Sequence, residues 1–268
     1  MPIITISRGS YSRGKKIAEE LALRLGYECI SRDILIEASD HFNIPEVKLV
    51  RALHDAPSVL ERFSHGKERY IAYIRKALLE HVAKDNMVYH GLAGHFLLQG
   101  IPHVLKVRII SNFTDRIQEE MRRENITEEE ARKILHKDDE ERRKWSLHLY
   151  GVDTADASLY DIVLHIDQID VDAAVDILAG ISARKCFQAT DASRAIFNDA
   201  LIAARAHAAL VETYPNIKVT SNDGLVCVNF EKNLMDNGKI KKIIGELLDP
   251  IDGVKGVWTN LISDRHFD

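Results

Sequence analysis

The apolar positions of the first 26 residues change their period from that of a strand to that of a helix. Residues 3–6 (IITI) form a short β-branched run, which is typical of a buried strand. From Lys15 to Leu25 the apolar residues recur at helical spacing, and Gly26 stands where a helix end favours a left-handed residue. Between them, residues 7–14 carry glycine and serine. The pattern predicts a strand, a glycine-bearing turn and a helix.

The same two periods alternate as far as about residue 180. Further strands are predicted at 28–30, 87–90, 104–110 and 161–166, and helices at 33–40, from 45 onward, at 67–84, 114–124, 128–149 and 171–178. Such alternation is typical of an α/β fold, a three-layer αβα arrangement around a parallel sheet. Ligands of such sheets bind beyond the carboxyl ends of the strands, so the turns after Ile6, His90 and Ile110 are the candidate sites.

The pattern changes near Gln188. An alanine-rich helix is predicted at 191–212, followed by strands at 216–220 and 225–230, a helix at 236–248 and a strand at 254–261. Between the first two strands, Asn222-Asp223-Gly224 is a strong hairpin signal. We therefore expect two domains, residues 1–187 and a smaller α+β domain of order α-β-β-α-β at 188–268.

Composition narrows the class of protein. The 268 residues carry a net charge of -5 and the pI is about 6.2, which disfavours nucleic acid as the main partner. Cys29, Cys186 and Cys227 lie far apart and fit no structural zinc motif, as in a reducing compartment. No run approaches the roughly 20 apolar residues of a membrane span. We expect a soluble, cytoplasmic protein with no transmembrane segment.

The first turn carries a candidate phosphate-binding loop of spacing G-x-x-x-x-G-K. Such a loop wraps phosphates with backbone N–H groups, aims a helix N-terminus at the anion and supplies a lysine. Lys16 stands where the motif has Ser or Thr, so magnesium would be held by Ser10, by Ser12, or by water and phosphates alone. A plain strand-to-helix turn with capping residues is the alternative. The residues of the loop are Gly9, Ser10, Tyr11, Ser12, Arg13, Gly14, Lys15 and Lys16.

The helices predicted at 114–149 are rich in arginine. One interpretation is a solvated face with ion pairs four residues apart, such as Glu128 with Arg132. The other is a functional one, because phosphoryl transfer depends on cations that surround the transferring group, and arginine is the preferred donor. The sequence pattern leaves both open.

Several separated motifs resemble the cytidylate kinase-like family, a branch of the P-loop proteins related to nucleoside monophosphate kinases. The resemblance covers about residues 1–180. The segments that carry it are Ile4-Thr5-Ile6-Ser7-Arg8 with Gly14, Ile17-Ala18-Glu19-Glu20-Leu21-Ala22, Gly26-Tyr27, Arg32-Asp33-Ile34-Leu35, Thr127 to Lys133, Asp139, Glu141-Arg142, Trp145, and Tyr160-Asp161-Ile162-Val163-Leu164.

The resemblance implies an ATP-dependent transfer of the γ-phosphoryl group to a nucleoside monophosphate or a related small acceptor, with ATP and Mg²⁺ as cofactors. By position, Gly9 to Lys16 would hold the ATP phosphates. The catalytic candidates are Lys15, Arg116, Arg132 and Arg142, and the candidates on the acceptor side are Arg32, Asp33, His90 and Gly91.

Three positions depart from the family pattern. The lysine of the loop slips by one residue, Ser31 replaces an aspartate, and Leu92 replaces an arginine after the strand at 87–90. A lost arginine would weaken the binding of a monophosphate, since charge-assisted contacts to phosphate are strong. An alternative function is therefore a non-catalytic nucleotide sensor with a degenerate loop.

The C-terminal part resembles a BON domain, a small α+β family associated with membrane lipids or other ligands. The resemblance rests on residues 217–219, 223–228 and 253–261, the last of which read Gly-Val-Lys-Gly-Val-Trp-Thr-Asn-Leu. No basic amphipathic face commits this copy to membranes. We expect a module that regulates the first domain, contacts a partner or joins copies of the chain.

Overall fold

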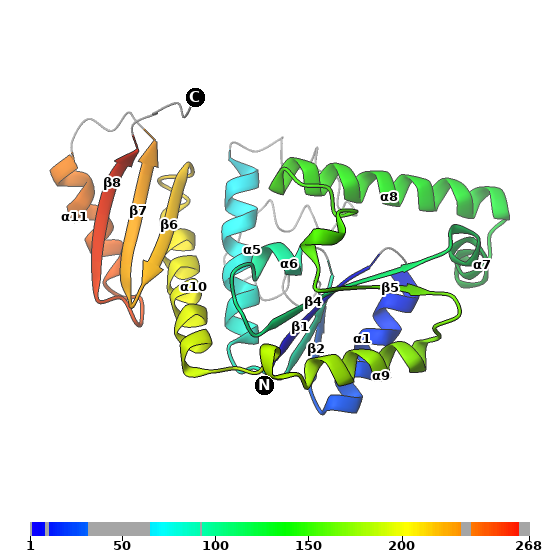
Figure 1. Ribbon diagram of the computed structural model, residues 1–268. Coiled ribbons are helices and arrows are strands. Elements are labelled where there is room, and N and C mark those ends of the chain that lie inside the picture. Colours follow the sequence, from blue (N-terminus) through cyan, green and yellow to red (C-terminus); the bar gives the residue numbers. More distant parts are fainter. Residues whose placement is uncertain (1, 9–10, 32–64, 92, 232–236, 263–268) are drawn as a thin grey trace, which may run out of the picture. The chain divides into compact units, whose positions relative to one another are not determined.

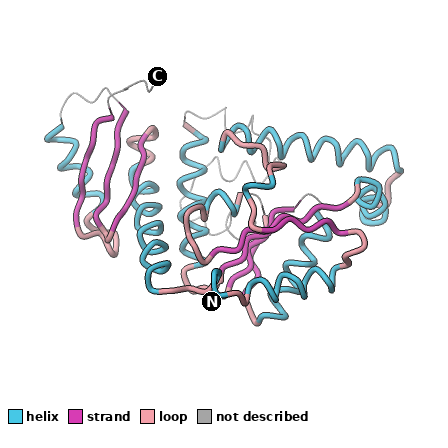
Figure 2. The backbone as a smooth tube through the Cα atoms, viewed as in Figure 1, coloured by secondary structure: helices cyan, strands magenta, loops and turns pink. Residues whose placement is uncertain are grey.

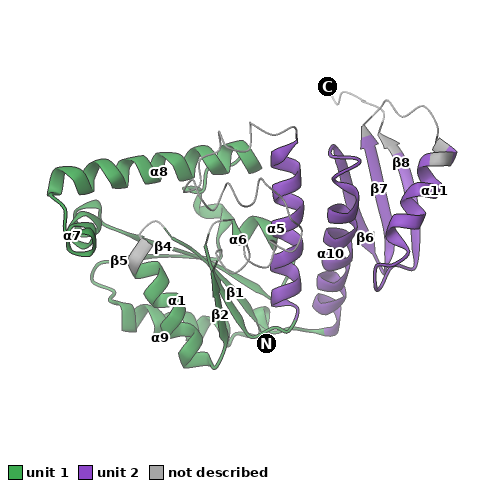
Figure 3. Ribbon diagram, turned by 180° about the vertical axis from the view of Figure 1, so that it is seen from behind, with its two compact units in different colours: residues 1–59, 84–190 green, residues 60–83, 191–268 purple. Residues whose placement is uncertain are grey.

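The computed structural model describes residues 2–8, 11–31, 65–91, 93–231 and 237–262. These residues divide into two compact units, one made of 2–31 and 84–190, the other of 65–83 and 191–262 (Figure 3). Across these ranges no helix is long and apolar enough to cross a membrane.

The first unit is built around a five-stranded parallel sheet of order β2-β3-β1-β4-β5, as Figure 2 shows in magenta. Every pair of neighbouring strands is parallel. The strands are β1 (Ile3–Arg8), β2 (Glu28–Ser31), β3 (Met87–His90), β4 (Val104–Ser111) and β5 (Ile162–Ile166). The helices are α1 (Tyr11–Leu25), α6 (Gly94–Leu97), α7 (Phe113–Glu124), α8 (Glu128–Tyr150) and α9 (Val171–Ser182), with 3-10 turns at Ala157–Leu159 and Lys185–Phe187.

Two faces of this sheet differ in character. Ile4, Ile6 and Val107 point to the face covered by α1 and α9, where they join an apolar core. Because side chains alternate along a strand, Ser7 and Arg108 point to the opposite face, the side on which α8 lies (Figure 1). The α/β fold expected from the sequence is confirmed. The second face combines buried apolar side chains (Ile3, Met87, Tyr89 and Val104) with the polar Ser7 and Arg108 nearer the carboxyl ends of the strands.

The first turn is shorter than the sequence predicts. The strand continues to Arg8 and the helix already begins at Tyr11, so residues 11–14 form the first turn of α1 and not a loop. The expected helix start at Lys15 was therefore wrong by four residues, because polar residues in a first helical turn carry no apolar period. The helix end was predicted correctly: Gly26 has φ +67°. The short helix α6 had no sequence signal.

The second unit contains α10 (Asp191–Leu210), β6 (Ile217–Asn222), β7 (Leu225–Glu231), α11 (Asn237–Leu248) and β8 (Gly256–Ile262). The order α-β-β-α-β is the expected one, and the sheet is mixed, with β6 antiparallel and β8 parallel to the central β7. The unit also includes α5 (Gly66–Val82), which the sequence placed in the domain 1–187. Tyr73 and Arg69 of α5 bind Glu212, and Glu80 binds Arg205 of α10.

One carboxylate of α10 holds the hairpin between β6 and β7. Asp223 and Gly224 both have positive φ, as the Asn-Asp-Gly signal predicts. Asp199 accepts hydrogen bonds from the Ser221 hydroxyl and from the N–H groups of Asp223 and Gly224, at 2.8, 2.8 and 3.0 Å. Burial would raise the pKa of Asp199, but these hydrogen bonds outweigh it and lower the pKa.

Replacing Asp199 by alanine is expected to destabilise the second unit by about 1–3 kcal/mol, because two N–H groups of the turn lose their acceptor. Hydrogen exchange of the peptide 217–231 in the full chain measures this loss. The neighbouring Asn198→Ala is the control, since Asn198 is exposed on the same helix. Equal protection of this peptide in the two variants would contradict the role of Asp199.

Candidate functional site

The site is built where β1 ends and α1 begins. The backbone N–H groups in the first turn of a helix lack intrahelical acceptors and favour an anion, and the first turn of α1 carries no acidic residue. Gly14 allows the first turn of α1 to lie close to the end of β1, since a Cβ at Gly14 would lie only 2.6 Å from Cβ of Arg8. The glycine of the motif therefore serves the close packing of α1 against the end of β1.

Two arginines and a histidine meet at this strand end. Arg142 of α8 donates from Nη1 to the carbonyl oxygen of Arg8 at 3.2 Å. Nη1 of Arg8 lies 3.5 Å from Nδ1 of His90, which is buried at the end of β3. Gly91 donates its N–H to the carbonyl of Ile6 at 3.2 Å and so extends the ladder between β3 and β1. Arg142, His90 and Gly91, all predicted from the sequence, thus lie around one strand end, together with Arg8.

The basic residues at the start of α1 have other partners. Arg13 donates to the carbonyl of Ile166 at 3.2 Å and lies within 4 Å of carboxylates on α7. Lys15 and Lys16 are exposed and pair with Glu19 and Glu20 one helical turn later, at 3.6 and 3.7 Å. In this structure neither lysine side chain closes over the end of β1.

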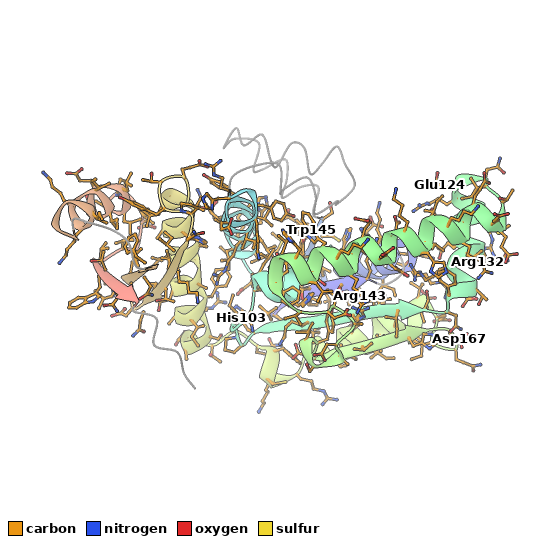
Figure 4. All side chains as sticks on the ribbon, turned by 90° about the horizontal axis from the view of Figure 1, so that it is seen from above. His103, Glu124, Arg132, Arg143, Trp145 and Asp167 are labelled. Atoms are coloured by element: carbon orange, nitrogen blue, oxygen red, sulfur yellow. The ribbon has the colours of Figure 1, made fainter. Side chains whose placement is uncertain are left out.

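The other two arginines predicted for the lid are held within α7 and α8. Arg116 makes a two-pronged ion pair with Asp139, with both N–O distances at 2.7 Å. Arg132 pairs with Glu128 at 2.9 Å, the solvated i,i+4 pair that the sequence offered as an alternative. Figure 4 shows Arg132 toward the α7 end of α8, with Arg143 and Trp145 farther along the helix. Only Arg142, among the three, has its described hydrogen bond at the end of β1.

A polar network on the α8 side of the sheet was missed by the sequence analysis. Arg108 of β4 donates from Nη1 to the carbonyl of Thr154 and to the hydroxyl of Tyr160, the latter at 3.2 Å. Tyr160 also donates to Ser7 at 3.3 Å and lies under the Arg108 guanidinium, 5.5 Å from the ring centroid. The one available signal was a pair of basic residues, Lys106 and Arg108, at alternate positions of a strand that is mostly apolar.

Some expected site residues lie outside the described ones: Gly9, Ser10, Arg32 and Asp33, and also Leu92. Tyr11 and Ser12 are described only as helical backbone. Within the described ranges, histidine, cysteine and acidic side chains form no group of three that could hold a metal ion.

Comparison with known proteins places most of the first unit in a family. The model of the cytidylate kinase-like family matches residues 3–168. A cytidylate kinase of Methanosarcina acetivorans is 32% identical over 100 residues, which are 37% of this chain and 54% of that protein. The chain thus spans about half the length of that relative. A cytidylate kinase of Sulfolobus acidocaldarius is 22% identical over 183 residues, 68% of this chain and 94% of that protein.

A solved structure has the same fold. A protein of Eubacterium ventriosum, described as uncharacterized, aligns with a TM-score of 0.53 and 21% identity, over 69% of this chain and all of that one. At this identity the likeness supports the fold alone.

Proposed function

The chain belongs to the cytidylate kinase-like family, and we propose that it transfers the γ-phosphoryl group of ATP to a nucleoside monophosphate, with CMP as the first acceptor to test. Membership implies the use of ATP and a nucleotide substrate. The acceptor phosphate oxygen is already a nucleophile, so the protein has to position two phosphates and neutralise charge between them, without a general base.

The observation that carries this proposal is the position of Arg142. It reaches from α8 to the carbonyl oxygen of Arg8, where β1 ends and three residues before α1 begins at Tyr11. The first turn of α1 packs against the same residue, since a Cβ at Gly14 would lie 2.6 Å from Cβ of Arg8, so the guanidinium and this helix N-terminus both adjoin Arg8. The geometry supports an anionic group held between a helix N-terminus and an arginine from the lid, as phosphoryl transfer requires.

The described residues fit the phosphates of ATP. The first turn of α1 would bind them with N–H groups, and Arg8 and Arg142 would balance their charge. Magnesium, when bound, would neutralise phosphate oxygens. Arg116 and Arg132 stay expectations of the resemblance, because ion pairs with Asp139 and Glu128 now hold their guanidinium groups; closing over phosphates would require them to exchange these partners.

The proposal is tested with the full chain, ATP, MgCl₂ and a panel of acceptors: CMP, dCMP, UMP, AMP and GMP. ADP formation is followed in a coupled assay and the diphosphate product is identified by ³¹P NMR. We expect turnover that depends on the acceptor and is fastest with CMP. Tight ATP binding by calorimetry without turnover on any acceptor would contradict it and support the nucleotide sensor.

For residues 188–268 we propose a BON-like module that contacts a partner or a second copy of the chain. The order α-β-β-α-β supports this, as does the turn Gly253 to Gly256 that leads into β8. The family model ends at residue 168, so the support comes from topology and motif only.

A further inference from the structure

Arg108 has an unused pair of donors. It is partly buried on β4, opposite Ser7 of β1 in the parallel register. Both of its hydrogen bonds leave from Nη1 and go to neutral oxygens, the Thr154 carbonyl and the Tyr160 hydroxyl. Within the described part of the chain, Nε and Nη2 have no hydrogen-bond partner and no carboxylate lies within ion-pair distance. These two nitrogens form the fork that binds a carboxylate or phosphate with two parallel hydrogen bonds.

Nearby acidic groups are already engaged. Asp153 is within reach of the Arg108 charge, but its pKa is lowered chiefly by the hydrogen bond from the Ala155 N–H and that from Arg143, both at 2.8 Å. Lys106, two residues before Arg108 on the same face, pairs with Asp161 at 3.3 Å. The positive charge of Arg108 is thus the one on this face of β4 that no described carboxylate matches.

A second polar group beside it also lacks a partner. His95 of α6 is only 4% exposed, and neither of its ring nitrogens has a hydrogen-bond partner among the described residues. Its ring packs on Phe96 and on Tyr160, with centroids 4.0 and 4.7 Å away. Burial, and then the charges of Arg108 and Lys106, lower the pKa of His95 to about 3. The ring is therefore neutral, with one buried N–H donor unused, and such a group costs free energy unless something binds it.

The position of Arg108 and His95 in the fold indicates which anion they would bind. The first turn of α1, proposed for ATP, belongs to the helix on the other face of the sheet. Arg108 and Tyr160 lie on the α8 face, and His95 follows β3 by five residues, in the segment that begins with the expected acceptor residues His90 and Gly91. Two anions, one near α1 and one near Arg108, would then lie on either side of the end of β1.

We propose that Arg108, with His95 and Ser7 beside it, binds the phosphate group of the acceptor nucleotide. The assignment of the anion to the acceptor rests on the proposed function, whereas the anion-binding role of Arg108 does not. Nε and Nη2 of Arg108 hold two phosphate oxygens, and His95 donates from its unused N–H. The subsite supplies an arginine from β4 where Leu92 leaves none after β3.

The test measures binding first, and uses turnover only to separate the subsite from the kinase reaction. Calorimetry on the full chain compares CMP, cytidine, inorganic phosphate and ATP for the natural protein and for Arg108→Gln, Arg108→Lys and Arg143→Gln. Arg143 is the matched control, because it binds the same 153–160 segment through Asp153. In Arg108→Gln we expect the Kd of CMP and of phosphate to rise about tenfold or more, with ATP changed less than threefold, as the loss of a forked charge-assisted contact predicts. In Arg108→Lys we expect a smaller rise, and in Arg143→Gln none.

Each result decides the proposal. Unchanged affinity for CMP and phosphate in Arg108→Gln overturns it, and so does an unchanged affinity in Arg108→Lys if the glutamine variant does not fold. A loss shared equally by CMP and cytidine also overturns it, because the phosphate would then not be the group recognised. A protein that loses phosphate binding in Arg108→Gln but never forms ADP keeps the subsite and refutes only the kinase. If the Arg108→Gln variant turns over CMP with an unchanged KM, the kinase activity is supported and the subsite is refuted.

Discussion

Replacing Arg142 by glutamine is expected to lower kcat/KM for phosphoryl transfer by about 100-fold or more, because a preorganised cation at the transferring group stabilises charge that water cannot reach. The side chain already lies at the end of β1, 3.2 Å from the Arg8 carbonyl, so no rearrangement has to bring it there. Glutamine keeps an N–H donor on a shorter side chain and removes the charge. The coupled assay with ATP and CMP measures the effect.

The control is the next residue on α8. Arg143 is two-thirds exposed and pairs with Asp153 at 2.8 Å, so Arg143→Gln removes an equal charge from the same helix without touching the end of β1. It should change kcat/KM by less than about threefold, in line with the small effect of exposed ion pairs. Equal losses in the two variants would mean that Arg142 acts only through the general charge of α8.

Replacing Gly14 by alanine is expected to weaken ATP binding about tenfold or more and to destabilise the first unit by about 1–3 kcal/mol, as overpacking does. The added Cβ would stand 2.6 Å from Cβ of Arg8, an atom fixed to the backbone of β1 that cannot turn aside. The first turn of α1 must therefore move away from the strand end, and its N–H groups move with it. Calorimetry with ATP and urea unfolding measure the two effects.

Gly180 provides the opposite case. It lies in α9 with no atom within 4 Å of the place for a Cβ. Gly180→Ala should stabilise the protein by about 0.5–1 kcal/mol through helix propensity and leave ATP binding unchanged. If Gly14→Ala were as well tolerated, the close approach of α1 to β1 would not be what the glycine serves.

The fold could be predicted because the spacing of apolar residues follows directly from which face of each strand or helix is buried. The strand 87–90 was predicted at its observed bounds, the helix 128–149 to within one residue, and the hairpin at Asp223 and Gly224 by its turn residues. These segments each bury one face, so the sequence records the arrangement in its spacing.

Features that depend on which other segment of the chain an element or side chain contacts could not be predicted in the same way. The amphipathic pattern at 67–84 indicated a helix, but an apolar stripe does not say which surface it will meet, and α5 groups with α10. Arg116 and Arg132 were equally plausible as lid residues from the sequence, and Asp139 and Glu128 hold them in this structure. Arg108 was overlooked because its importance comes from donors left over after its neighbours are placed, which no spacing shows.

The grouping of α5 with the C-terminal elements bears on how the chain is made and how it can be cut. During synthesis, Arg69 and Tyr73 leave the ribosome about 140 residues before Glu212, and Glu80 precedes Arg205 by 125. The second unit therefore cannot be completed until the last third of the chain has been synthesised. The sequence of the first unit is interrupted by α5, a helix of the second unit. A polypeptide ended at residue 187 would keep α5 but lack all three partner contacts, so removing the C-terminal elements also leaves α5 without the residues that it pairs with.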